Sequence, residues 1–151
     1  MAEADLVIKN GWVVTPEETF QGGVAISGEK IVAIGANDSL PHGKEEIDVK
    51  GRHILPGLFD GHVHFREPGM THKEDFTTGS TAAVCGGITT IVDMPNTVPP
   101  TADAEQVKIK KELGEAKSLV DFGITGVPQV SVMVGIFKQQ FVRSHRAHAV
   151  I

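Results

Sequence analysis

Two histidines that stand one residue apart, His62 and His64, are the side chains of this sequence best suited to hold a metal ion. They lie in the segment 59–69, which reads FDGHVHFREPG. Because side chains of a β-strand alternate between its two faces, Asp60, His62 and His64 are predicted to share one face. Two neutral imidazoles on one face can bind a single divalent cation. The segment therefore predicts a metal site, against the alternative of two ordinary surface histidines.

Two further polar residues follow the ends of neighbouring predicted strands. Arg66 comes two residues after His64, and Asn96 lies in the segment DMPNT that ends a β-branched run. Active sites of α/β folds form at the carboxyl ends of strands, so the two loops are expected to converge. A guanidinium there can hold a carboxylate through two parallel hydrogen bonds. Taken singly, Arg66 reads as a solvated cation paired with Glu67, and Asn96 as a turn residue; their joint placement favours a ligand site.

The first fifty residues read as short strands joined by tight turns. Asn10-Gly11 lies between two β-rich runs and predicts a hairpin. Ser27-Gly28 separates two more apolar runs. This pattern favours a small antiparallel sheet or half of a β-sandwich.

After Pro56-Gly57 the pattern changes to alternating strands and helices. Thr71 and Glu74 have the spacing of a capping box, and Gly86-Gly87 is expected to end the first helix. The predicted order is strand 58–65, helix 71–87, strand 88–95, helix 101–119 and strand 120–126. Such alternation predicts βαβ units around a parallel sheet.

The second helix carries most of the charge in this part of the chain. Its apolar residues Ile109, Leu113, Ala116 and Val120 recur at helical spacing and are expected to form the buried face. The lysines and glutamates are then expected to be solvated. Farther along, the segment 130–137, VSVMVGIF, reads as one more strand.

The composition is that of a globular protein with 151 residues and a net charge of −5, which leaves no basic footprint for nucleic acid. No apolar run approaches the roughly 20 residues that a membrane span needs. The acidic start of the chain does not resemble a secretory signal, so a cytoplasmic location is expected. Cys85 is the single cysteine, which excludes an intrachain disulfide, and its small apolar neighbours predict a buried packing residue.

Longer motifs carry a resemblance to a known family. The segments PGLFDGHVHFREPG and KEDFTTGSTAAVCGGITTIVDMPNTVPP, together with the N-terminal strands, resemble the cyclic amidohydrolases, most closely the dihydroorotases of the longer bacterial and archaeal type. The resemblance covers residues 5–126. It implies an α/β chain with part of a small β-sandwich over residues 1–55. Residues 56–151 would then form the first βα units of a metal-dependent TIM-like (β/α)8 barrel, truncated and atypical after about residue 127.

The resemblance also implies roles for the polar residues. His62 and His64 match the family's first pair of metal ligands, for one or two zinc ions, and Arg66 and Asn96 match residues that hold the substrate carboxylate. The implied reaction interconverts N-carbamoyl-L-aspartate and L-dihydroorotate in pyrimidine synthesis. Allantoinases, which usually carry asparagine where Arg66 stands, and hydantoinases are the alternative enzymes. A non-catalytic, dihydroorotase-like structural protein is the other alternative function. The possible protein partners are a second copy of the chain, in a homo-oligomer, or aspartate carbamoyltransferase.

The family pattern is incomplete in this sequence. The bridging ligand, the later histidines and the catalytic aspartate follow the third barrel strand in the family, and a full barrel needs about 250 residues. The chain is therefore expected to be a truncated or frameshifted gene product, a fragmentary gene model or one piece of a larger assembly. It is expected to be inactive alone, and its catalytic residue is unassigned. Lys138 only faintly matches the bridging lysine, and His145 and His148 read as parts of an exposed basic tail; none of the three is assigned as a ligand.

Overall fold

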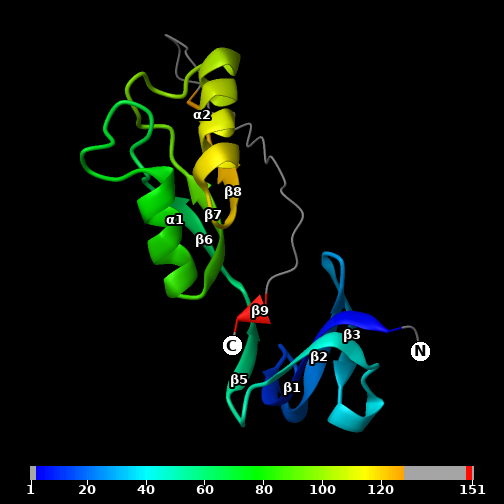
Figure 1. The fold of residues 1–151 in the computed structure, drawn as a ribbon. Coiled ribbons are helices and arrows are strands. Elements are labelled where there is room, and N and C mark those ends of the chain that lie inside the picture. Colours follow the sequence, from blue (N-terminus) through cyan, green and yellow to red (C-terminus); the bar gives the residue numbers. More distant parts are fainter. Residues whose placement is uncertain (1–2, 128–148, 151) are drawn as a thin grey trace. The chain divides into compact units, whose positions relative to one another are not determined.

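The computed structural model describes residues 3–127 and 149–150 (Figure 1). The expected strand at 130–137 and the residues Lys138, His145 and His148 lie outside the described residues. The described chain forms two compact units. The first comprises the residues up to Gly57 together with Ala149–Val150, and the second begins at Leu58.

The first unit is a mixed β-sheet. Its elements are β1 (Ala4–Val14), β2 (Thr19–Ser27), β3 (Lys30–Gly35), the 3₁₀ turn η1 (Asn37–Ser39), β4 (Gly43–Asp48), β5 (His53–Pro56) and β9 (Ala149–Val150). The strand order is β3-β2-β1-β5-β9, with β4 also paired to β1. The antiparallel arrangement expected from the sequence holds for β1, β2 and β3. It is wrong for β4 and β5, which run parallel to β1 because the chain crosses over after β3 before it pairs again.

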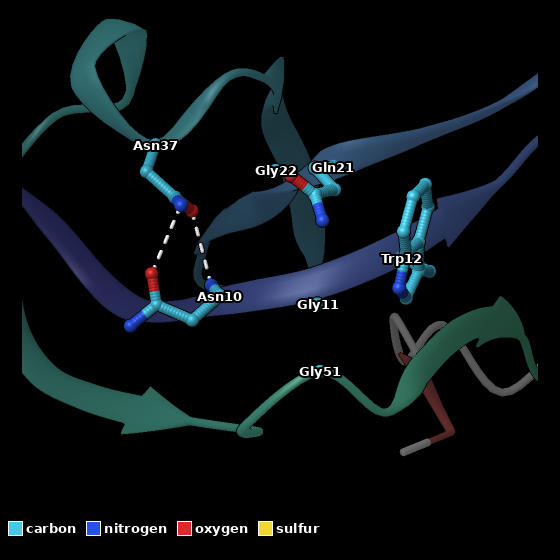
Figure 2. Close-up of a pocket in the computed structure, with 7 residues that line it drawn as sticks. All are labelled: Asn10, Gly11, Trp12, Gln21, Gly22, Asn37 and Gly51. Carbon is cyan, nitrogen blue, oxygen red and sulfur yellow. Dashed lines mark hydrogen bonds between the residues drawn. The ribbon is translucent and has the colours of Figure 1, made fainter.

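The predicted hairpin at Asn10-Gly11 is wrong, because β1 runs straight through these residues. The register of β1 against β2 shifts between Ile8 and Gly11, and Asn10 has φ 61°. A left-handed residue serves a β-bulge as well as a turn. Asn10 donates its N–H to Asn37 Oδ1 at 3.0 Å and accepts from Asn37 Nδ2 at 2.9 Å, beside a pocket that Trp12 also lines (Figure 2).

The core of the first unit consists of β-branched side chains from β1, β2, β5 and the turn after β4. Its buried members are Ile8, Val13, Val24, Ile26, Val49 and Ile54. Gly11 is required here because a Cβ would come within 2.7 Å of both Val49 and Ile54. The bulge therefore brings the glycine to a point where two core side chains touch the backbone.

The second unit is a three-stranded parallel sheet with helical crossovers. Its elements are β6 (Leu58–Val63), α1 (Phe76–Cys85), β7 (Ile88–Asp93), α2 (Ala104–Lys117) and β8 (Asp121–Ile124), in the strand order β6-β7-β8. This confirms the predicted βαβ units. Phe76 joins α1 to the core, where its ring centroid lies 5.7 Å from that of Phe122, and Leu113 of α2 packs against the same core. Neither α1 nor α2, the two α-helices of the described part, is long and apolar enough to span a membrane.

Helix α1 begins later than the sequence predicted. Asp75 caps it by accepting the N–H of Thr78 at 2.8 Å, so the capping box proposed for Thr71 and Glu74 is wrong. The predicted end is confirmed, with Gly86 as C-cap followed by Gly87 at φ 79°.

The prediction that Cys85 is buried is also wrong, because this residue is exposed. Cys85 lies nine residues after the buried Phe76, which at 100° per residue places it on the opposite side of α1. The small residues around Cys85 are compatible with a helix but do not determine which of its faces is buried.

Helix α2 packs through a different face from the one predicted. Leu113 does contact the core, but Ile109 is 37% exposed and Ala116 is exposed. The fully buried positions are Lys110 and Gly114. Gly114 decides this orientation, because its missing side chain lets the Phe122 ring reach the helix; a Cβ there would come within 2.5 Å of that ring.

Candidate metal and substrate site

The loops that follow β6 and β7 meet, as the sequence predicted. Met94 donates its N–H to the carbonyl of Val63 at 2.9 Å, and Val98 donates to the carbonyl of Pro68 at 3.1 Å. Gly69 has φ 86°, and any Cβ there would overlap the carbonyl oxygen of Val98. Two loops that are 30 residues apart in sequence thus form one surface.

His62 and His64 lie next to each other. Their ring centroids are 5.1 Å apart and the ring planes meet at 71°. Although β6 ends at Val63 and its pairing with β7 is irregular there, His64 stays beside His62. Asp60 accepts the backbone N–H of His62 at 3.0 Å, a contact within β6.

Asn96 contacts His64 directly. The Oδ1 atom of Asn96 lies 2.6 Å from Nδ1 of His64. Because an amide oxygen only accepts hydrogen bonds, Nδ1 is the donor in this contact and Nε2 is the ring nitrogen left for a metal. A histidine held in this way at one ring nitrogen is ready to bind a metal through the other. The sequence placed Asn96 in the neighbourhood but gave no sign of this contact.

The donor chemistry of the two histidines fits zinc, which binds imidazole nitrogen readily. Zinc sites use three or four protein ligands, and within residues 3–127 and 149–150 no group of three His, Cys, Asp or Glu residues could hold a metal ion. On the described residues, His62 and His64 could provide two ligands of such a site, fewer than zinc normally requires.

Arg66 is placed after β6 with a left-handed backbone, φ 63°, and its carbonyl accepts the N–H of Met70 at 3.0 Å. It does not pair with its neighbour Glu67. The buried Glu67 carboxylate instead pairs with Lys117 and accepts the N–H of Phe76 at 3.1 Å. Within the part of the chain that the structure describes, the Arg66 guanidinium forms no ion pair, so it is available to an anion.

Sequence reasoning missed a buried ion pair beneath these loops. Asp93 and Lys110 are both 0% exposed, and Lys110 Nζ lies 2.8 Å from Asp93 Oδ2. This oxygen makes an ion pair without a directed hydrogen bond. Burial lowers the pKa of Lys110, and the Asp93 charge opposes this shift. The sequence predicts that the lysines of α2 are solvated, and this prediction is wrong for Lys110. In the sequence, the signal of close packing on this side of the helix is Gly114, four residues later.

The chain is similar in sequence to proteins of one known family. A model described as "Amidohydrolase family" matches residues 53–131. The dihydroorotase of Methanothermobacter thermautotrophicus is 55% identical over 95 residues, which cover 62% of this chain and 22% of that protein. The allantoinase of Deinococcus radiodurans is 42% identical over 123 residues, covering 81% of this chain and 27% of that protein.

A solved structure shows the same fold. The L-hydantoinase (dihydropyrimidinase) from Arthrobacter aurescens superposes with a TM-score of 0.76 at 31% sequence identity, covering 82% of this chain and 28% of that one. The chain thus spans about a quarter of the length of the relatives that it matches. On the match to residues 53–131, which include His62, His64, Arg66 and Asn96, the chain belongs to the amidohydrolase family.

Proposed function

We propose that this chain supplies the first metal ligands and the carboxylate-binding residues of a cyclic amide hydrolase of the dihydroorotase type. The reaction is the reversible conversion of L-dihydroorotate to N-carbamoyl-L-aspartate. The observation that carries the proposal is the contact of His64 with Asn96, which joins the histidine pair and Arg66 on one loop to the asparagine on the other. The 55% identity to a dihydroorotase supports the choice of substrate.

His62 and His64 hold the metal in this proposal, with His64 using Nε2 because Nδ1 is occupied by Asn96. Zinc, when bound, polarises the amide carbonyl of the ring and makes water a better nucleophile at neutral pH. The protein's own contribution is to place the two imidazoles side by side and to orient that of His64 through Asn96. The remaining metal ligands and the group that moves the proton of the ring nitrogen are not assigned to any described residue.

Arg66 and Asn96 bind the carboxylate of the substrate in this proposal. The Arg66 guanidinium offers a planar pair of donors that matches a carboxylate. Asn96 can contribute as well, because its oxygen is used by His64 while its amide nitrogen, Nδ2, remains a donor. One side chain would then orient a metal ligand and touch the substrate.

Allantoinase is the second candidate, favoured by relatives such as that of Deinococcus radiodurans. The two candidates differ at Arg66. Allantoin carries no carboxylate, so a guanidinium at this position gives it little advantage, whereas L-dihydroorotate and N-carbamoyl-L-aspartate both present an anion. The residue at position 66 therefore favours the dihydroorotase type.

Isothermal titration calorimetry on the purified chain with zinc tests this choice. We expect L-dihydroorotate to bind and the uncharged rings hydantoin and allantoin to bind at least tenfold more weakly. Arg66→Ala should abolish the difference, and Arg52→Ala, a change of an exposed arginine in the first unit, should not. Binding of allantoin that exceeds that of L-dihydroorotate and survives Arg66→Ala would reject the proposal in favour of the second candidate.

A further inference from the structure

Asp93 connects the ends of all three strands of the parallel sheet. Its carboxylate oxygen Oδ1 accepts the N–H of Phe65 at 2.9 Å, just beyond β6. Its backbone carbonyl accepts both the N–H of Thr125, at 3.0 Å, and the hydroxyl of Thr125, at 2.9 Å, just beyond β8. Asp93 itself is the last residue of β7. One buried residue therefore determines how three chain segments leave the sheet.

Lys110 completes this arrangement from α2. Its ammonium group donates to the carbonyl of Met94 at 2.6 Å and lies 2.8 Å from Oδ2, the second carboxylate oxygen of Asp93. With a side chain that is 0% exposed, Lys110 has no route to a substrate or to solvent. Its two partners are the residue that ends β7 and the first residue of the following loop.

The atoms that this pair contacts are adjacent to the candidate site. Phe65 stands between His64 and Arg66, and Met94 is two residues before Asn96. Fixing the N–H of Phe65 and the carbonyl of Met94 therefore fixes the backbone on both sides of the contact between His64 and Asn96. Glu67 provides a second buried anchor on the far side of Arg66, through Phe76 and Lys117.

A buried ion pair is a poor way to gain stability alone, since apolar replacements of similar volume are often neutral or better. A buried ion pair does fix the orientation of the groups it joins, because both partners must keep their hydrogen-bond geometry in a medium of low polarity. A pair used for direction should therefore lie beside groups whose orientation matters, and this one lies directly beneath the loops of the site.

We propose that Lys110 and Asp93 are positioning residues that hold the His64 and Asn96 side chains in register for metal and carboxylate binding. The proposal rests on the proposed function for the identity of the site. The contact it explains, from His64 Nδ1 to Asn96 Oδ1, can be measured without activity. Neither residue touches the substrate, and both act through the backbone of the two loops.

The test is nuclear magnetic resonance of the histidine ring nitrogens in the full chain at pH 8.5, followed by zinc titration. We expect wild-type His64 to be hydrogenated at Nδ1 alone. Lys110→Met should convert it to the mixture of tautomers of a free imidazole and weaken zinc binding by about tenfold or more, the usual effect of losing an outer partner of a metal ligand. His42, whose side chain is 99% exposed in the first unit, serves as an internal reference.

Two variants control this result. Lys108→Met makes the same change on the same helix at a lysine whose side chain is 76% exposed, and it should leave the His64 tautomer and zinc affinity unchanged. The double substitution Asp93→Asn/Lys110→Gln removes both charges but retains a donor toward Met94. It should restore much of the Nδ1 form that Lys110→Met loses.

A Lys110→Met protein that keeps the wild-type His64 signals and zinc affinity, while it only unfolds at a lower temperature, would overturn the proposal and make the pair structural. If Lys110→Met does not fold, amide hydrogen exchange of the wild-type chain decides. The Phe65 amide should then exchange as slowly as that of Ile91 in the core of β7, and exchange at the rate of an exposed amide would overturn the proposal.

Failure of the proposed function gives a different result. Suppose that His64 is hydrogenated at Nδ1, that Lys110→Met removes this form, and that the chain binds neither zinc nor L-dihydroorotate. The positioning role would then stand and the proposed function would fail. If the wild type and Lys110→Met bind zinc and L-dihydroorotate equally well, the proposed function would stand and the positioning role would fail.

Discussion

Glu67 pairs with Lys117 of α2 and leaves its neighbour Arg66 without a carboxylate partner in the described part of the chain. The Glu67 carboxylate is almost fully buried and also receives the first N–H of α1, from Phe76. One acidic side chain thus ties the loop after β6 to the start of α1 and the end of α2. Arg66 is half-buried, and its guanidinium is not paired with Glu67, which is turned inward to Lys117.

Glu67→Gln should weaken the fold, since it removes the charge that pairs with Lys117 while it retains an oxygen for Phe76. We expect a loss of about 1.5–3 kcal/mol in the free energy of unfolding, the usual range for a hydrogen bond to a charged group. Urea unfolding measures it. Glu112→Gln, at an exposed ion pair within α2, is the matched control and should change stability by less than about 0.5 kcal/mol. Equal effects of both changes would contradict the buried role of Glu67.

Gly114→Ala should destabilise the second unit even though alanine favours helix. The added Cβ would come within 2.5 Å of the Phe122 ring, so either the helix or the ring must move. Overpacking of this kind costs about 1–3 kcal/mol, against a gain of about 1 kcal/mol in helix propensity. Thermal unfolding followed by circular dichroism should show a lower midpoint. Glu115→Ala, at the next and exposed position, should not lower it, and a stabilised Gly114→Ala would show that α2 packs through another face.

The start of α1 should show a pH dependence that Asp75 controls. The N–H and hydroxyl of Thr78 lower the pKa of Asp75 from its ordinary value of 3.8. A carboxylate with a lowered pKa in the folded state contributes stability that is complete above the unfolded value and is lost as the pH falls through the folded value. Stability measured in urea should therefore decline below pH 3.8. Asp75→Asn, which still caps the helix, should show a shallower decline; an identical slope would mean that the cap is not charge-dependent.

Zinc should raise the midpoint of thermal unfolding of the chain, because a ligand that binds only the folded state stabilises it by mass action. His64→Ala should remove this effect, and a chelator should reverse it in the wild type. His42→Ala changes a histidine whose side chain is 99% exposed in the first unit and should keep the effect. A zinc response that survives both His62→Ala and His64→Ala would place the metal elsewhere.

The sequence was sufficient for the elements that depend on local pattern. The strands of the second unit, the glycine stop of α1 and the βαβ order follow from hydrophobic spacing and breakers, and all are confirmed. The errors arose where one local signal serves two structures. Asn10-Gly11 marks a left-handed residue, which the sheet uses for a bulge. On α2 the apolar spacing predicts one buried face, but Gly114 lies on another. The Phe122 ring packs against Gly114, so this second face is the buried one.

The candidate site shows the same division. His62, His64, Arg66 and Asn96 could be selected from sequence because they follow strands that end at one edge of a sheet. The contacts among them could not, because a hydrogen bond such as that between His64 and Asn96 spans 32 positions. Asp93 and Lys110 were missed because a charged side chain in a helix is expected in water. Only the packed structure shows that Lys110 is enclosed.

The left-handed backbone at Arg66 bears on how substrate preference can change. Among residues other than glycine, asparagine adopts φ near 60° with the least strain, and arginine gains nothing from it. Exchange of arginine for asparagine, the residue that the resemblance assigns to allantoinases, would thus be neutral or slightly favourable for folding. Under the proposed function, a change of preference from acidic to neutral rings through residue 66 therefore costs no backbone strain. Whether arginine or asparagine is kept there can then depend on ligand binding alone.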